Sequence, residues 1–201
     1  DLGNLGQPGS PVPGSFRAQG ITFHGENRRS SVLHLVTNGT EKWFYDNESI
    51  DTEKLARLNF EHLRFETDDP LKGNGFKQWS QGWDKQFRYY SCDFSLGKIM
   101  QFEGTGNADL NRFLMCNITA YDYALTFNNA QSVSTEFITT ETSTRKGLVD
   151  VLDKGGGAFR VISGNHEMHP HPTDTEDHYF IRIAQDARVN LGNGDFNITD
   201  G

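Results

Sequence analysis

Cysteine is scarce in this sequence, which excludes one large class of small β proteins. Only 2 cysteines occur in 201 residues, so the chain is not a disulfide scaffold. Cys92 and Cys116 both lie in alternating apolar patterns, which places both on predicted strands. A cross-strand disulfide and two buried thiols both fit this placement, and we favour the free thiols.

Basic clusters and long apolar runs are also missing. The net charge is −8, and the densest basic stretches are the pairs Arg28-Arg29 and Arg145-Lys146. This charge distribution does not predict a tight nucleic-acid binder, so any contact with nucleic acid would be local. No apolar run approaches the roughly 18 residues needed to cross a bilayer, so we expect no membrane segment. Because the first residue is Asp1, we expect the chain to begin after processing or as an excised piece.

Aromatic residues and glycine are abundant instead. The sequence holds 15 Phe, 6 Tyr, 3 Trp and 21 Gly, a mixture that favours short strands joined by turns. The length fits one domain. Residues 1–20 are rich in glycine and proline and predict a flexible arm, which leaves residues 21–201 as a single folded domain.

Alternating apolar residues predict the strands. Segments 32–36 and 42–45 flank an Asn38-Gly39 turn and predict a hairpin, and "HYFIRIA" with "ARVNL" predicts another near the C-terminus. Residues 51–57 predict a short helix or turn. Two longer strands present one face each, with Tyr90, Cys92, Phe94 and Leu96 on the first and Leu114, Cys116, Ile118 and Ala120 on the second. These segments give eight or nine strands and almost no helix, so we predict an all-β fold, an antiparallel jelly roll or β-sandwich of about eight strands. We find no internal repeat.

Four of the 7 histidines gather between residues 163 and 183, among acidic residues. His169 and His171 are two residues apart, so on a strand both would point to the same side, and Glu176 and His178 share this relation. Imidazole and carboxylate are ligands of Zn, Fe, Mn or Ni. The candidate metal ligands are His166, His169, His171, Glu176 and His178. A divalent cation with a structural role, a catalytic metal and a solvated loop without metal are the three interpretations.

The segment "HPHPTDTE" resembles the first metal motif of the cupins, in which HxH is followed a few residues later by Glu. The resemblance implies a metal-dependent enzyme. However, no His follows His178, and only 25 residues follow Glu176, which is too short for the second half of a cupin barrel. No other catalytic motif is present, and we expect a protein without enzymatic activity.

Two features point to carbohydrate instead. Trp43, Trp79 and Trp83, with Phe76 nearby, could line a sugar-binding face, because aromatic rings stack on the apolar faces of sugars. Sequons at Asn38, Asn47, Asn117 and Asn197 are modestly more frequent than chance gives. A secreted carbohydrate-binding β-sandwich is therefore one alternative function.

The order of elements suggests another. A glycine-rich arm precedes the strand "SSVLHLV", the segment "TEKW" (residues 40–43) and a pair of long strands. This order resembles the single jelly-roll capsid proteins of small icosahedral viruses, particularly densovirus-like parvoviruses. The resemblance implies a non-enzymatic structural protein that self-assembles into a shell and resides in the virion. This is the leading functional prediction, with the cupin-like enzyme and the secreted carbohydrate-binding protein as alternatives.

Overall fold

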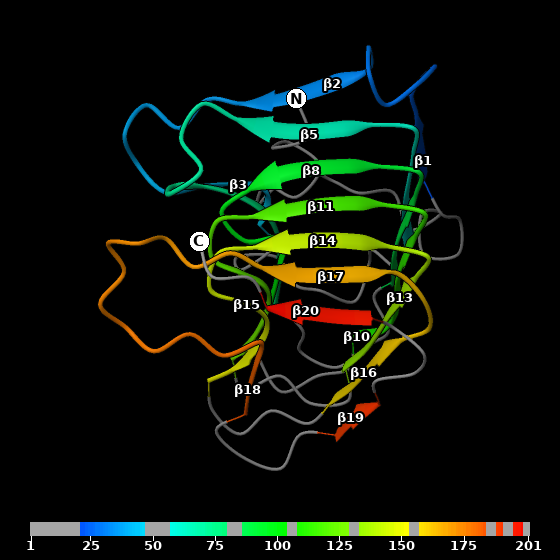
Figure 1. Cartoon of the computed structure of the whole chain (residues 1–201). Helices are drawn as coiled ribbons and strands as arrows, with labels where there is room; N and C mark the ends of the chain where they lie inside the picture. Colours follow the sequence, from blue (N-terminus) through cyan, green and yellow to red (C-terminus); the bar gives the residue numbers. More distant parts are fainter. Residues whose placement is uncertain are drawn as a thin grey trace.

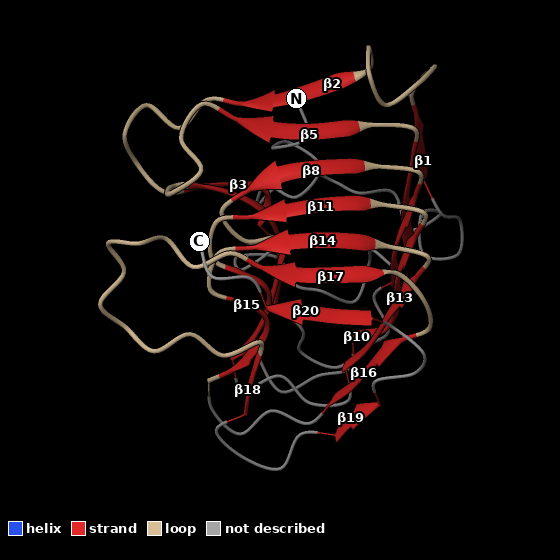
Figure 2. Cartoon of the chain, viewed as in Figure 1, coloured by secondary structure: helices blue, strands red, loops and turns tan. Residues whose placement is uncertain are grey.

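The computed structural model describes residues 21–46, 57–79, 86–103, 108–128, 133–152, 157–183, 188–190 and 195–198. These residues form strands and turns without any helix, so the all-β prediction is confirmed (Figure 2). It follows that no helix in the described part of the chain is long and apolar enough to span a membrane.

The strands belong to three sheets, here named A, B and C (Figure 1). Sheet A contains β1 (Ile21–His24), β4 (Arg57–Glu61), β7 (Gln86–Tyr90), β10 (Ala108–Leu114), β13 (Val133–Ile138), β16 (Gly157–Val161) and β19 (Arg188–Asn190). Sheet B contains β2 (Val32–Leu35), β5 (Arg64–Thr67), β8 (Asp93–Leu96), β11 (Asn117–Ala120), β14 (Glu141–Thr144), β17 (Asn165–Met168) and β20 (Asp195–Ile198). Sheet C contains β3 (Lys42–Asp46), β6 (Gly73–Trp79), β9 (Met100–Glu103), β12 (Tyr123–Asn128), β15 (Gly147–Val151) and β18 (Ile181–Ile183).

The chain visits sheets A, B and C in turn and then starts again, so three successive strands make one coil of a solenoid. Each strand inside a sheet pairs in parallel with its equivalents one coil earlier and one coil later, and the strand at either edge pairs with one of them. In the middle of the molecule Phe113 pairs with Phe137, an offset of 24 residues that recurs between neighbouring coils. This arrangement is a parallel β-helix, in which each coil contacts only its neighbours.

The prediction of an antiparallel jelly roll or β-sandwich was wrong. The prediction that the chain has no internal repeat was also wrong, because its coils repeat. Asn38 and Gly39 do form a turn with positive φ, but β2 and β3 on either side belong to different sheets and do not pair. The predicted C-terminal hairpin fails in the same way, because β18 lies in sheet C and β19 in sheet A. Alternating apolar residues show that one face of a strand is buried, but they carry no information on the direction of its neighbours.

The corner between sheets A and B explains why the long predicted strands are broken. His62, Ser91, Met115 and Thr139, at φ of 55°, 50°, 54° and 49°, occupy the same place in four consecutive coils. A left-handed residue turns the chain and resets the alternation of its side chains. Tyr90 therefore points outward while Cys92, two residues later, is fully buried, contrary to the prediction that they share a face.

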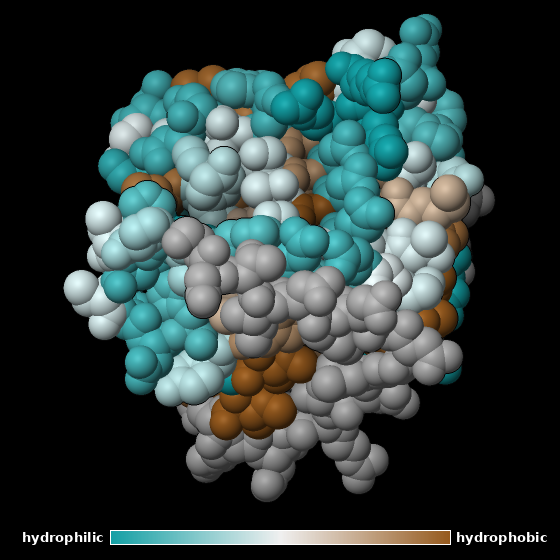
Figure 3. Space-filling view, in the orientation of Figure 1, coloured by the Kyte–Doolittle hydropathy of each residue, from teal (hydrophilic) through white to brown (hydrophobic). Residues whose placement is uncertain are grey.

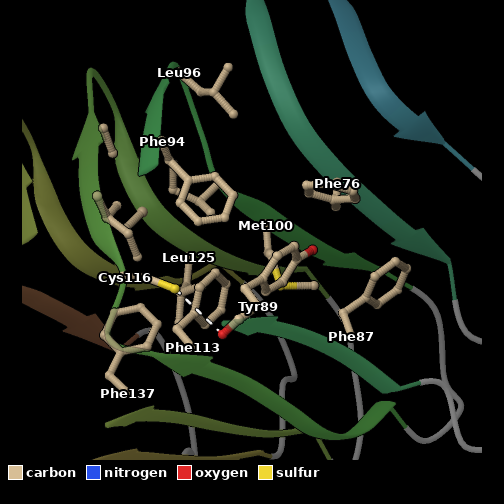
Figure 4. Packing of buried hydrophobic residues seen from close by; sticks show 14 of the residues in the cluster. Phe76, Phe87, Tyr89, Phe94, Leu96, Met100, Phe113, Cys116, Leu125 and Phe137 are labelled. Carbon is tan, nitrogen blue, oxygen red and sulfur yellow. Dashed lines mark hydrogen bonds between the residues drawn. The ribbon is translucent and has the colours of Figure 1, made fainter. Parts of the chain in front are cut away.

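Aromatic side chains stack along the interior of sheet A (Figure 4). The rings of Phe60, Tyr89, Phe113 and Phe137 follow one another, with centroids 5.3, 4.6 and 4.9 Å apart. All four are at most 1% exposed. Burying a side chain of this size stabilises the fold by about 2–3 kcal/mol, so this stack joins the coils along the axis.

Cys92 and Cys116 are free thiols buried next to each other in consecutive coils, as favoured from the sequence. Each thiol donates to a carbonyl of the preceding coil, Cys92 to Phe60 at 3.4 Å and Cys116 to Tyr89 at 3.5 Å. Thr140, one coil further on, donates its hydroxyl to a carbonyl in the same way. The cysteines therefore occupy a structural position that a threonine fills in the next coil.

The predicted N-terminal arm, residues 1–20, lies outside the described residues, as do residues 51–56 of the predicted short helix or turn. Arg57, the last residue of that segment, begins β4.

Candidate functional site

A groove lies at the corner between sheets B and C, and the lengths of the connecting loops create it. Three consecutive coils turn this corner in two or three residues, at Gly97–Ile99, Tyr121–Asp122 and Arg145–Lys146. The coils before and after them use longer loops, residues 36–41 and 68–72 on one side and 169–180 on the other. Figure 1 shows these loops projecting beyond the short turns between them. We call the space between them the corner groove.

The corner groove has a cavity volume of about 410 Å³. Its lining comes from all three segments: Glu41, Pro70, Leu71 and Asn74 on the upper wall, Gly97, Lys98, Tyr121, Asp122, Arg145 and Lys146 on the floor, and Thr173, Asp174, Thr175, Glu176 and His178 on the lower wall. A second hollow of about 180 Å³ continues it toward sheet C and shares Lys98, Asp122, Lys146 and Glu176. The two hollows therefore adjoin at these four polar residues, and Figure 3, in the orientation of Figure 1, shows mostly hydrophilic residues on the loops beside them.

Backbone hydrogen bonds hold the floor in register. The amide of Tyr121 donates to Leu96 and that of Asp122 to Gly97, both at 2.9 Å, and the next turn repeats the pattern. Since neighbouring coils lie about 4.8 Å apart, equivalent side chains stand in rows along the axis. One row contains Lys98, Asp122 and Lys146, which alternate in charge.

The upper wall is fastened to the floor through Asn74, which is 4% exposed. Its side-chain oxygen accepts from the amide of Lys98 at 2.9 Å, and its amide nitrogen donates to Glu41 at 3.0 Å. Gly97 leaves room for this contact: a Cβ there would lie 2.5 Å from the Asn74 oxygen and 2.7 Å from the carbonyl of Pro70. A side chain at Gly97 would therefore push the upper wall away from the floor.

The lower wall is fastened by an ion pair between Arg145 and Asp174. The guanidinium donates through two nitrogens to both carboxylate oxygens, one of these bonds measuring 2.8 Å. The hydrogen bonds from Arg145 hold the pKa of Asp174 well below its usual range. Asp174 also accepts from the amide of His171 at 3.1 Å, and the Nδ1 of His178 donates to the carbonyl of Arg145 at 3.2 Å. The 169–180 loop is thus tied to the β14–β15 turn.

The two lysines of the floor have different surroundings. The Nζ of Lys146 lies 3.6 Å from Asp122 and 3.7 Å from Glu176, so two carboxylates balance it. The Nζ of Lys98 donates to the neutral side chain of Gln101 at 3.2 Å. Among the residues that the structure describes, no carboxylate lies within ion-pair distance of Lys98. Its charge is therefore available to a ligand.

The five predicted metal ligands are not brought together. His166 is fully buried on β17, where its Nδ1 contacts the hydroxyl of Thr142 at 3.0 Å. His169 contacts Glu167 at 2.9 Å, and His171 contacts Thr173 at 2.7 Å. Glu176 and His178 line the corner groove, where each has the partner given above.

Within the described ranges, no group of three or more His, Cys, Asp or Glu side chains could hold a metal ion. Residues 169–180 also form a loop and not the strand that the paired-ligand hypothesis required. The metal site stays a prediction without geometric support.

Two of the aromatic residues expected to bind sugar, Phe76 and Trp43, lie away from the corner groove. Phe76 is fully buried in the core, and Trp43 is half-buried on β3. The side chain of Trp79 and the whole of Trp83 lie outside the described residues. Of the two that the structure describes in full, Trp43 and Phe76, neither lines the corner groove.

Tyr121, with 38% of its surface exposed, is the aromatic residue that does line the groove, and sequence reasoning missed it. Lys98, Asp122 and Lys146 were also missed as a site. An alignment of the chain with itself at an offset of 24 residues would have stacked Gly97-Lys98, Tyr121-Asp122 and Arg145-Lys146, but this offset had not been recognised.

The structure thus defines a parallel β-helix with one walled corner. No family model, curated protein or solved structure matches the chain, so its class is defined by the fold alone.

Proposed function

We propose that the corner groove binds a carbohydrate chain. The observation that carries this proposal is Tyr121, which is 38% exposed and lines the floor of an open polar groove together with Lys98, Asp122, Arg145 and Lys146. Sugar rings pack their apolar faces on aromatic side chains. Carboxylates accept and ammonium groups donate the hydrogen bonds that sugar hydroxyls require.

The dimensions of the groove suit a linear chain. Its floor spans three coils, and at about 4.8 Å per coil this gives a width on the order of 10–15 Å between the walls. The groove is open and continues toward sheet C, so a chain longer than one sugar could cross the corner. Repeating structures of this kind offer extended surfaces for such ligands.

Nucleic acid is a weaker candidate for this groove. The chain carries a net charge of −8, and Asp122, Asp174 and Glu176 would face the phosphates. The mixture of both charges with a tyrosine favours a ligand that is rich in hydroxyl groups.

The proposal is tested by a glycan array, followed by titration calorimetry with the glycans that bind. Tyr121→Ala should weaken binding by about tenfold or more, because it removes the stacking surface. Tyr90→Ala is the matched control, since Tyr90 is 40% exposed but lies at the A–B corner. Equal affinities for both variants and the unchanged protein would contradict the proposal, as would an array without any binding.

The capsid hypothesis depended on an antiparallel jelly roll, and the parallel sheets remove that support. Self-assembly is still a prediction, which the size of the native particle tests directly. The loss of β-sandwich architecture does not affect the proposal of carbohydrate binding, because the groove is a product of the solenoid.

A further inference from the structure

The two halves of the corner groove differ in how far their charges are already balanced. In the lower half Arg145 is paired with Asp174, and Lys146 lies between Asp122 and Glu176. A ligand that entered there would have to displace an existing ion pair. The lower half is therefore suited to holding the loop in place.

The upper half contains the open binding surface. Leu71 is 71% exposed and Pro70 lies beside it, while Tyr121 presents its ring from the floor. Gly97 has no side chain to fill the space between Tyr121 and the upper wall. Apolar surface on two sides is what the faces of a sugar ring require.

Lys98 is the cation among the described residues that line this upper half, where Glu41 is the acidic residue. Lys98 adjoins Gly97 in the turn and belongs to both hollows, and within the described part of the chain its side-chain partner is the neutral Gln101. Glu41 of the upper wall accepts a hydrogen bond from the side-chain amide of Asn74. The presence of Lys98 in this half therefore indicates a ligand that carries an anionic group.

We infer that the carbohydrate bound in the corner groove carries carboxylates, as in a chain of uronic acids, and that Lys98 pairs with one of them while Tyr121 supports the sugar ring. This inference rests on the proposed carbohydrate binding and narrows it to one chemical class. A hydrogen bond between an ammonium and a carboxylate is stronger than one to a neutral hydroxyl. The groove should therefore bind acidic chains more tightly than neutral ones.

The experiment compares acidic chains with neutral chains of the same sugar backbone. The probes are polygalacturonate, polymannuronate and polyglucuronate, each beside its carboxyl-reduced form, titrated against the whole chain by calorimetry. The protein should bind at least one acid about tenfold more tightly than its reduced form. Added salt should weaken binding of the acid and leave binding of the reduced form unchanged.

Variants assign this preference to Lys98. Lys98→Met should abolish the preference for the acid with less than a twofold effect on the reduced chain, and Lys98→Arg should restore most of it. Arg160→Met is the control, because Arg160 is an exposed cation on β16 of sheet A and does not line the groove. Circular dichroism and thermal unfolding of each variant establish that it is folded.

Two outcomes would overturn the inference in distinguishable ways. The first is equal binding of acidic and reduced chains, or binding of neutral glycans alone, which would refute the role of Lys98. The proposal of carbohydrate binding would still hold in that case if Tyr121→Ala weakened glycan binding. Binding of no glycan of any kind would refute both the inference and the proposed function.

Discussion

The buried histidine of β17 predicts a specific loss of stability at mildly acidic pH. His166 is inaccessible to solvent, lies beside the ring of Phe137 and contacts Thr142. Burial lowers the pKa of His166 from 6.5 to about 4. The folded protein therefore keeps this side chain neutral at pH values where the unfolded chain binds a proton.

The sign and the magnitude follow from proton linkage. Because the unfolded state binds more protons between the two pKa values, stability rises with pH in this window and falls on acidification. From pH 7 to pH 5 the expected loss is about 2 kcal/mol from His166 alone. The loss should continue toward pH 4 and then level off, since below that value both states carry the charge.

The assay is urea unfolding of the protein and of His166→Asn at a series of pH values. The variant loses stability at every pH, because asparagine fills the site poorly, so the informative quantity is the slope against pH. Between pH 7 and pH 5 the free energy of unfolding should fall by about 2 kcal/mol less in His166→Asn than in the unchanged protein. The control is His171→Asn, since His171 is exposed in the 169–180 loop. An unchanged slope in His166→Asn would refute the reasoning.

Two further predictions concern the walls of the corner groove. Gly97→Ala should destabilise the protein by about 1–3 kcal/mol in urea unfolding and weaken glycan binding, because the new methyl group clashes with Asn74 and the Pro70 carbonyl. Unchanged stability would contradict this, because the upper wall would then have moved to make room for the methyl group at no cost. Asp174→Ala should release the 169–180 loop from Arg145, and limited proteolysis should then cut this loop faster than in the unchanged protein, whereas an equal rate would contradict the proposed fastening.

Some features of the fold could be predicted from local patterns. The strands around Phe94 and Ile118 were found because their inward residues alternate with polar ones, and this alternation holds from Cys92 to Leu96. The Asn38-Gly39 turn was found because both residue types tolerate positive φ. Each of these signals depends only on a residue and its immediate neighbours.

The corner residues were the source of the main errors. Ser91 and Met115 adopt the left-handed conformation although neither is a glycine, and Met115 is a residue type that rarely does so. Nothing in the local sequence marks them as corners. The predicted long strands consequently passed through them, and longer strands favoured an antiparallel sandwich.

The metal hypothesis shows the same limit at the level of side chains. His169 and His171 were expected on one side of a strand, but they lie in a loop where His169 contacts Glu167 and His171 contacts Thr173. His166, from the same short segment, is in the core. Proximity in the sequence did not imply a shared site.

The sequence by itself determined that this protein is built of short strands and which residues are buried within a strand such as that from Cys92 to Leu96, and it favoured free thiols over a disulfide. The tertiary structure alone decided that the strands run parallel, and it alone created the groove. Tyr121 and Lys98 line the same groove because hydrogen bonds between coils place Tyr121 beside Gly97, 24 positions earlier, and Lys98 follows Gly97 in the turn. Leu71 joins them from a longer loop in another coil. These contacts depend on how the coils are stacked, and no pattern within a single strand can reveal them.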